Sequence, residues 1–190
     1  MKALENAIVK LELKRQLSID LVVSREVFIN GLKKQMKSEL ESPLISGFEI
    51  FSSDNTSFVG DITEDGFTLR SKRVAGKSVR HIAVAKGIIE ENEKGLSVLI
   101  EINAFRGIYS CMLLLLIPLY VCLFLGSLYI GVVRLNLEAL LSLIFILFHG
   151  AFMIGGPVFL LSKAARILDQ NLEYIIKEIE NNDSSKQEAL

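Results

Sequence analysis

The chain has 190 residues, with 21 Lys and Arg against 22 Asp and Glu, and a mean hydropathy of +0.42. A net charge of -1 gives no support for a nucleic-acid-binding protein, which needs a basic surplus, and two cysteines eleven positions apart cannot form a disulfide framework. Positive mean hydropathy beside 23% charged residues predicts that the apolar residues are concentrated in one part of the chain.

Residues 1–106 carry 16 basic and 15 acidic side chains, a composition typical of a soluble domain. Apolar residues alternate over residues 8–23, which predicts one bent strand or two short strands. A helix over residues 2–15 is a competing interpretation, because Leu4, Ile8 and Leu11 also share a helical face. Residues 1–20 lack the apolar core of a signal peptide, so we expect no cleavable signal.

A helix is predicted to follow Ser24, which is a suitable N-cap residue. Its apolar side chains repeat at four-residue spacing: Phe28, Leu32, Met36 and Leu40. The helix should therefore run to about Leu40 and end before Pro43.

The remainder of this domain is predicted to form antiparallel strands. Asp65-Gly66 and residues 91–95 are hairpin signals. The expected strands cover residues 46–51, 58–63, 67–72, 80–90 and 96–105. The predicted fold class is α+β, with an opening strand, one helix, and a four- or five-stranded antiparallel meander whose one face the helix covers.

Residues 107–162 contain only one basic and one acidic residue, Arg134 and Glu138. As helices rising about 1.5 Å per residue, residues 107–133 and 139–162 would span roughly 40 and 36 Å, whereas a bilayer core is about 30 Å thick. The connector has five residues. We therefore predict a two-helix transmembrane hairpin that leaves both chain ends on the same side.

The basic residues around the hairpin predict its orientation. The turn offers only Arg134, while the opposite side carries more: Lys94, Arg106, Lys163, Arg166 and Lys177. The positive-inside rule places that side in the cytoplasm, and we expect a bacterial inner membrane. Arg106, Arg134, Lys163 and Arg166 are expected to anchor the helices at the membrane interfaces.

His149 is an ionisable residue inside the second span, where such a group is costly and tends to face a partner or a wet cavity. Three helix-bending residues follow it: Gly155, Gly156 and Pro157. One interpretation is a proton- or ligand-sensitive kink. The favoured interpretation is a neutral histidine that bonds across the hairpin to a residue such as Ser127 or Tyr129.

Helix-packing surfaces are predicted within the spans and beyond them. Small residues at one-turn spacing are typical of contacts within the hairpin or with another membrane subunit: Ser127 with Gly131, and Ala151 with Gly155. Residues 163–190 are expected to continue as an amphipathic helix with a polar end, and its apolar seam includes Leu168, Leu172, Ile175 and Ile179. This seam either docks a partner or a second copy, or folds back on the chain's own sheet.

Glycine and apolar strand positions carry a resemblance to known proteins. They are Phe58, Gly60, Ile62, Gly66, Phe67, Leu69 and Arg70, then Gly87 and Ile89, then Gly95, Val98, Ile100 and Ile102. Leading into a membrane hairpin, this order resembles small uncharacterised bacterial membrane proteins over about residues 58–160, a group without an agreed activity. The opening strand followed by residues 24–28 also resembles START-like helix-grip domains, which hold lipids or other apolar ligands. In that fold a long C-terminal helix closes the cavity, whereas here the chain enters the membrane after the last strand.

The sequence offers no catalytic constellation. Cys111 and Cys122 lie about 16 Å apart along one helix, too far for one metal ion, and Gly76-Lys77-Ser78 lacks the upstream glycine of a phosphate-binding loop. We expect no metal, no cofactor and no enzymatic activity. The predicted function is an accessory, scaffold or regulatory membrane protein that binds a protein partner or forms homo-oligomers. The alternatives are a membrane-tethered sensor of a lipid or other apolar ligand, and a small oligomeric transport subunit.

Overall fold

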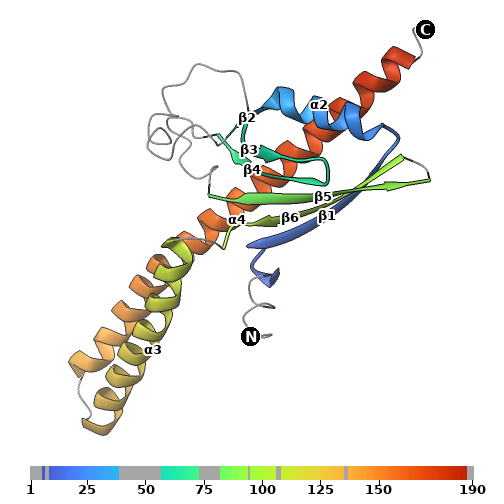
Figure 1. The fold of residues 1–190 in the computed structure, drawn as a ribbon. Coiled ribbons are helices and arrows are strands. Elements are labelled where there is room, and N and C mark those ends of the chain that lie inside the picture. Colours follow the sequence, from blue (N-terminus) through green and yellow to red (C-terminus); the bar gives the residue numbers. More distant parts are fainter. Residues whose placement is uncertain are drawn as a thin grey trace. The chain divides into compact units, whose positions relative to one another are not determined.

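A computed structural model describes residues 6, 9–38, 57–72, 82–93, 95–105, 108–134 and 137–187 (Figure 1). The chain divides into two compact units. The first combines Met1–Ala104 with Leu161–Leu190, and the second is Phe105–Leu160. The first unit is therefore discontinuous in sequence, and the second is inserted between its two parts.

The first unit contains a six-stranded sheet in the order β1-β6-β5-β4-β3-β2. The strands are β1 (Lys14–Leu21), β2 (Met36–Ser38), β3 (Phe58–Ile62), β4 (Gly66–Ser71), β5 (Val84–Asn92) and β6 (Gly95–Asn103). β1, β6, β5, β4 and β3 pair antiparallel in that order, and the short β2 pairs parallel with β3. The predicted α+β class and antiparallel meander are confirmed. The expected strand at 46–51 lies outside the described residues.

The start of the chain contains both a helical segment and a strand, the two structures that its sequence pattern predicts as alternatives. Val9 and Lys10 are helical, and the strand begins only at Lys14. Between them Glu12 adopts a left-handed backbone conformation with a φ of 56°. The Glu12 amide donates a hydrogen bond to the Val9 carbonyl at 2.9 Å, which closes this turn.

The first long helix of the unit, α2 (Arg25–Gln35), begins where it was predicted and ends earlier. The Ser24 hydroxyl accepts a hydrogen bond from the Val27 amide at 3.3 Å, which confirms the N-cap. The predicted extension to Leu40 was wrong after Gln35. Met36 is extended, with φ -112° and ψ 148°, and pairs with Phe58 as the first residue of β2. Pairing with β3 satisfies backbone groups there, and apolar periodicity contains no information about such a long-range partner.

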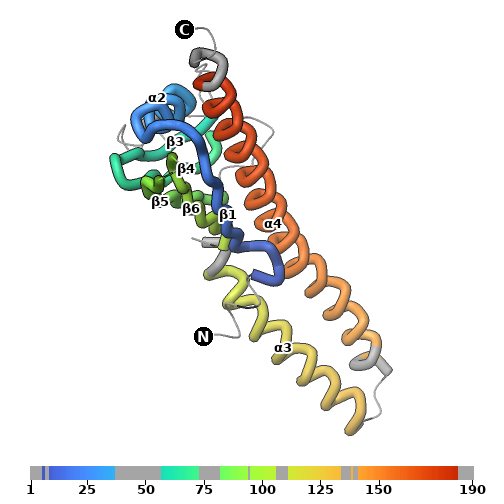
Figure 2. The backbone as a smooth tube through the Cα atoms, turned by 90° about the vertical axis from the view of Figure 1, so that its right-hand side faces the viewer, coloured from blue at the N-terminus to red at the C-terminus, as the bar shows by residue number. Residues whose placement is uncertain are grey.

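The core of the first unit lies between one face of the sheet and two helices. These are α2 and the C-terminal part of α4 (Leu137–Gln187), which runs alongside the sheet in orange and red (Figure 2). Fully buried side chains come from every layer: Val98 and Ile100 from β6, Phe28 and Leu32 from α2, and Leu168 and Leu172 from α4. Each such side chain contributes about 1.5–3 kcal/mol by leaving water.

The second unit consists of α3 (Ile108–Arg134) and the N-terminal part of α4. Both helices are long and apolar enough to cross a membrane, and only 6% of the most apolar window of each is buried. A helix in a protein core would be mostly buried, so this exposure suggests a membrane as the surroundings. Both helices continue through their prolines, Pro118 and Pro157, and the bend expected near Pro157 stays a prediction.

Candidate functional site

The second unit holds a polar pair between its two apolar helices. Tyr120 on α3 and His149 on α4 are hydrogen-bonded through the tyrosine hydroxyl and the imidazole Nδ1. Phe145, one turn before His149, stacks on the imidazole with ring centroids 5.3 Å apart and planes at 12°. A histidine bonded across the hairpin was predicted, but the partner is Tyr120 rather than Ser127 or Tyr129.

The close approach of the two helices depends on Gly150. A Cβ atom at this position would lie 2.9 Å from Cδ1 of Tyr120, which is closer than van der Waals contact allows. The glycine therefore lets the Tyr120 ring lie against α4, and from there its hydroxyl reaches the imidazole of the preceding residue.

The small residues predicted to pack differ in how closely the other helix approaches them. Gly131 is buried and Ser127 half-buried. Cβ atoms added at Gly155 and Gly156 would meet nothing within 4 Å, so α3 does not pack closely on either glycine. Ala151 and Gly155 instead line an open apolar groove of about 580 Å³ between the helices, next to Tyr120.

The hydrogen bond between Tyr120 and His149 can form in two proton arrangements. Either the hydroxyl donates to Nδ1 and leaves the proton of neutral imidazole on Nε2, or Nδ1–H donates to the hydroxyl and leaves Nε2 as an acceptor. Within the part of the chain that the structure describes, no polar contact satisfies Nε2. The Nε2 atom of His149 is therefore without a hydrogen-bond partner among the described residues.

The four residues predicted to form a docking seam on the C-terminal helix are buried in the first unit. Leu168, Leu172, Ile175 and Ile179 are at most 8% exposed. In this conformation the second predicted interpretation applies, in which the helix folds back on the chain's own domain. The seam is therefore part of the core and is not available to a partner unless α4 leaves the sheet.

Ion pairs tie the same part of α4 to the beginning of β1. Arg15 pairs with Asp169 at 3.1 Å, and Arg166 donates a hydrogen bond to Glu12 at 2.7 Å. This bond first, and the Arg166 charge second, hold the pKa of the Glu12 carboxyl below its usual value of 4.5. Arg166 was predicted to be an interface anchor, and its guanidinium is engaged here. Lys163 is exposed, Arg134 is the last residue of α3, and Arg106 lies outside the described residues.

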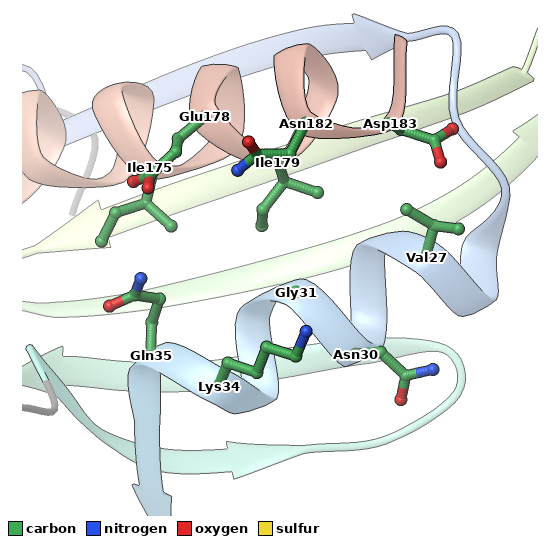
Figure 3. A pocket seen from close by; sticks show the side chains of 10 residues that line it. All are labelled: Val27, Asn30, Gly31, Lys34, Gln35, Ile175, Glu178, Ile179, Asn182 and Asp183. Carbon is green, nitrogen blue, oxygen red and sulfur yellow. The ribbon is translucent and has the colours of Figure 1, made fainter. Parts of the chain in front are cut away.

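A groove of about 460 Å³ runs between α2 and α4 in the first unit (Figure 3). Its floor is apolar, because Ile175 and Ile179 lie there beside Gly31. Polar and charged side chains form its walls: Asn30, Lys34, Gln35, Glu178, Asn182 and Asp183. Mixed charges on the walls make this groove a poor fit for a lipid chain.

The face of the sheet opposite the helices carries a patch that sequence reasoning did not identify as a site. Ile88 on β5 lies directly opposite Leu99 on β6, and the two are 54% and 49% exposed. They border a hollow of about 490 Å³ whose charged rim consists of Asp61, Asp65, Lys86 and Glu101. We call this surface the open-face patch. The open-face patch has a signal in the sequence. Ile88 and Leu99 are large apolar residues, whereas the residues two positions before and after each of them in the same strand are polar.

Among the described residues, no three His, Cys, Asp or Glu side chains are grouped so that they could hold a metal ion. Comparison of the chain with protein-family models, with curated proteins and with solved structures gives no match.

Proposed function

We propose that this protein is a non-enzymatic accessory or scaffold protein of the bacterial inner membrane, with a cytoplasmic domain that binds a protein partner. In this proposal α3 and the N-terminal part of α4 form the transmembrane hairpin. Its support is the exposure of large apolar side chains along both helices, for example 74% for Leu115 and 76% for Phe148. Burying such side chains in lipid is worth about 0.8 kcal/mol for each CH₂ group.

The proposed topology places both parts of the first unit in the cytoplasm. An antiparallel hairpin returns the chain to the side from which it entered, and the first unit is built from residues on both sides of the insertion. Lys163 follows the second span closely, while the turn carries Arg134, so the positive-inside bias favours the first unit as the cytoplasmic one.

The open-face patch is the surface we assign to the partner, and it is the observation that carries the proposal. Ile88 and Leu99 form a small contiguous apolar surface beside a hollow with a charged rim, and apolar surface rimmed by polar residues is a feature of protein-binding sites. Three acidic residues and one lysine form the rim. Glu101 and Asp65 already pair with Lys14 and Arg25 of this chain, so the partner surface that fits is an apolar cluster bordered by polar side chains. Since the seam of α4 is buried, the open-face patch replaces it as the docking surface.

A matched pair of substitutions tests this assignment. The full-length chain is purified from native membranes in a mild detergent, and co-purifying proteins are quantified for the wild type, Leu99→Asp and Val22→Asp. Val22 is 76% exposed in the connection after β1 and is not part of the patch. We expect Leu99→Asp to lose a stoichiometric companion that Val22→Asp retains. Equal retention by both variants, with unchanged circular dichroism, would contradict the proposal.

A further inference from the structure

His149 carries an unsatisfied hydrogen-bonding atom at the middle of an apolar segment. Its Nδ1 is engaged by Tyr120, while Nε2 has no partner among the described residues. The side chain lies on the exposed surface of the helix pair. The ten residues that separate it from Ala139 correspond to about 15 Å of helix, half the thickness of a hydrocarbon core of about 30 Å. Neither water nor lipid headgroups reach that depth.

Lipid tails cannot satisfy this atom, because they neither donate nor accept hydrogen bonds. An unpaired polar group in hydrocarbon costs several kcal/mol. The surroundings must therefore include a second polar group at the same depth. A second copy of this chain provides one, because every copy enters the membrane in the same orientation and places its own His149 at an equal depth.

The Tyr120–His149 pair is chemically self-complementary. In one copy the Tyr120 hydroxyl donates to Nδ1, and Nε2 carries the proton. In the other copy Nδ1–H donates to the hydroxyl, and Nε2 is an acceptor. A two-fold axis along the membrane normal can then join the two imidazoles by one Nε2–H···Nε2 hydrogen bond, which satisfies both Nε2 atoms.

The helix surface around His149 fits a second helix. Phe152, three residues after His149, lies on the same side of α4 and is 77% exposed. Gly156, one further turn along that side, has open space where a Cβ would be. The spacing of residues 149, 152 and 156 is that of the a and d positions of two packed helices.

We propose that the protein forms a dimer within the membrane, in which the two His149 side chains share a hydrogen bond across the two-fold axis and each is held by its own Tyr120. This inference rests on the proposed membrane insertion of the hairpin. It does not depend on the open-face patch or its partner.

Cysteine cross-linking in native membranes tests the geometry of the dimer. In a background with Cys111→Ala and Cys122→Ala, single cysteines are introduced as Phe152→Cys or Leu147→Cys. Leu147 is a matched control, because it is 56% exposed but lies two residues from His149 on the other side of the helix. We expect oxidation to give a disulfide-linked dimer for Phe152→Cys and little for Leu147→Cys. Equal cross-linking at both positions, or none at 152, overturns the proposal.

Fluorescence energy transfer between labelled full-length chains in vesicles of phosphatidylethanolamine and phosphatidylglycerol measures how strongly the chains associate, and it tests whether His149 contributes to that association. We expect His149→Leu to weaken association roughly threefold to twentyfold, the range for hydrogen bonds between membrane helices, while His149→Gln, which keeps a donor and an acceptor, stays near the wild type. An unchanged association of His149→Leu overturns the proposal.

Alkaline carbonate extraction of the native membranes tests whether the hairpin is inserted, independently of whether the chain forms a dimer. If the wild-type chain is extracted, the hairpin is not inserted, and the proposed function and the dimer fail together. If the chain resists extraction but does not associate through His149, only the dimer fails. Cross-linking of Phe152→Cys to a protein of a different mass would assign the histidine to another membrane protein and would also overturn the dimer.

Discussion

At the residue scale, Tyr120 lies close against Gly150 and brings the two apolar helices into contact. His149 could be identified from the sequence because it is ionisable and lies in an apolar run. Its partner could not be identified, because the sequence indicates depth and not the rotation of each helix about its own axis. Ser127, Tyr129 and Tyr120 are all polar residues of the first apolar helix, and only the packed structure shows that Tyr120 is the partner.

Alanine substitutions at two glycines test this contact. Gly150→Ala places a methyl group 2.9 Å from the Tyr120 ring, whereas Gly155→Ala places it in open space. We expect Gly150→Ala to be less stable than Gly155→Ala by about 1–3 kcal/mol, the cost of overpacking. Thermal unfolding of the two variants in the same detergent measures the difference. Identical midpoints would show that the Tyr120–Gly150 contact does not support the hairpin.

At the scale of elements, α4 is a single helix with two kinds of surroundings. Its N-terminal part exposes large apolar side chains, and its C-terminal part buries an apolar seam against the sheet and α2. The seam was predictable, since Leu168, Leu172, Ile175 and Ile179 repeat with helical spacing. The elements that cover the seam were not predictable, because a periodic pattern specifies which face of a helix is apolar but not which element packs against that face.

A core role for the seam predicts a large effect of truncating one side chain. Leu172 is fully buried, and Leu172→Ala should destabilise the domain by about 2–5 kcal/mol. Tyr174, two residues later, is 69% exposed, so Tyr174→Ala should change stability by no more than about 0.5 kcal/mol. Urea denaturation followed by circular dichroism compares them. If Leu172→Ala unfolds at the wild-type urea concentration, the seam is not part of the core.

At the scale of the whole molecule, the hairpin is an insertion into a folded domain. The sheet belongs to Met1–Ala104, but the helix that completes its core arrives only after the second unit. Residues 1–104 alone therefore lack a core layer. The structure joins Leu161–Leu190 to Met1–Ala104 in one compact unit, a connection that composition cannot reveal.

Replacing the hairpin tests this organisation. A chain in which a flexible Gly/Ser linker substitutes for Phe105–Leu160 should be soluble and monomeric and should unfold cooperatively, because it retains the complete first unit. The fragment 1–104 should lack cooperative unfolding, because its apolar sheet face is uncovered. Size-exclusion chromatography and thermal circular dichroism distinguish the two. Cooperative unfolding of the fragment at the temperature of the linked chain would contradict a discontinuous domain.

The amino-acid sequence by itself determined the features that depend on near neighbours. These are the two long apolar helices, the strands with alternating residues, the turn at Asp65-Gly66 and the cap at Ser24, because period and local backbone chemistry suffice for each. The tertiary structure decided where α2 gives way to β2, which element covers the seam of α4, which tyrosine bonds His149, and which sheet face stays open. Each of these depends on contacts between residues far apart in the chain, and such contacts form only when the layers pack.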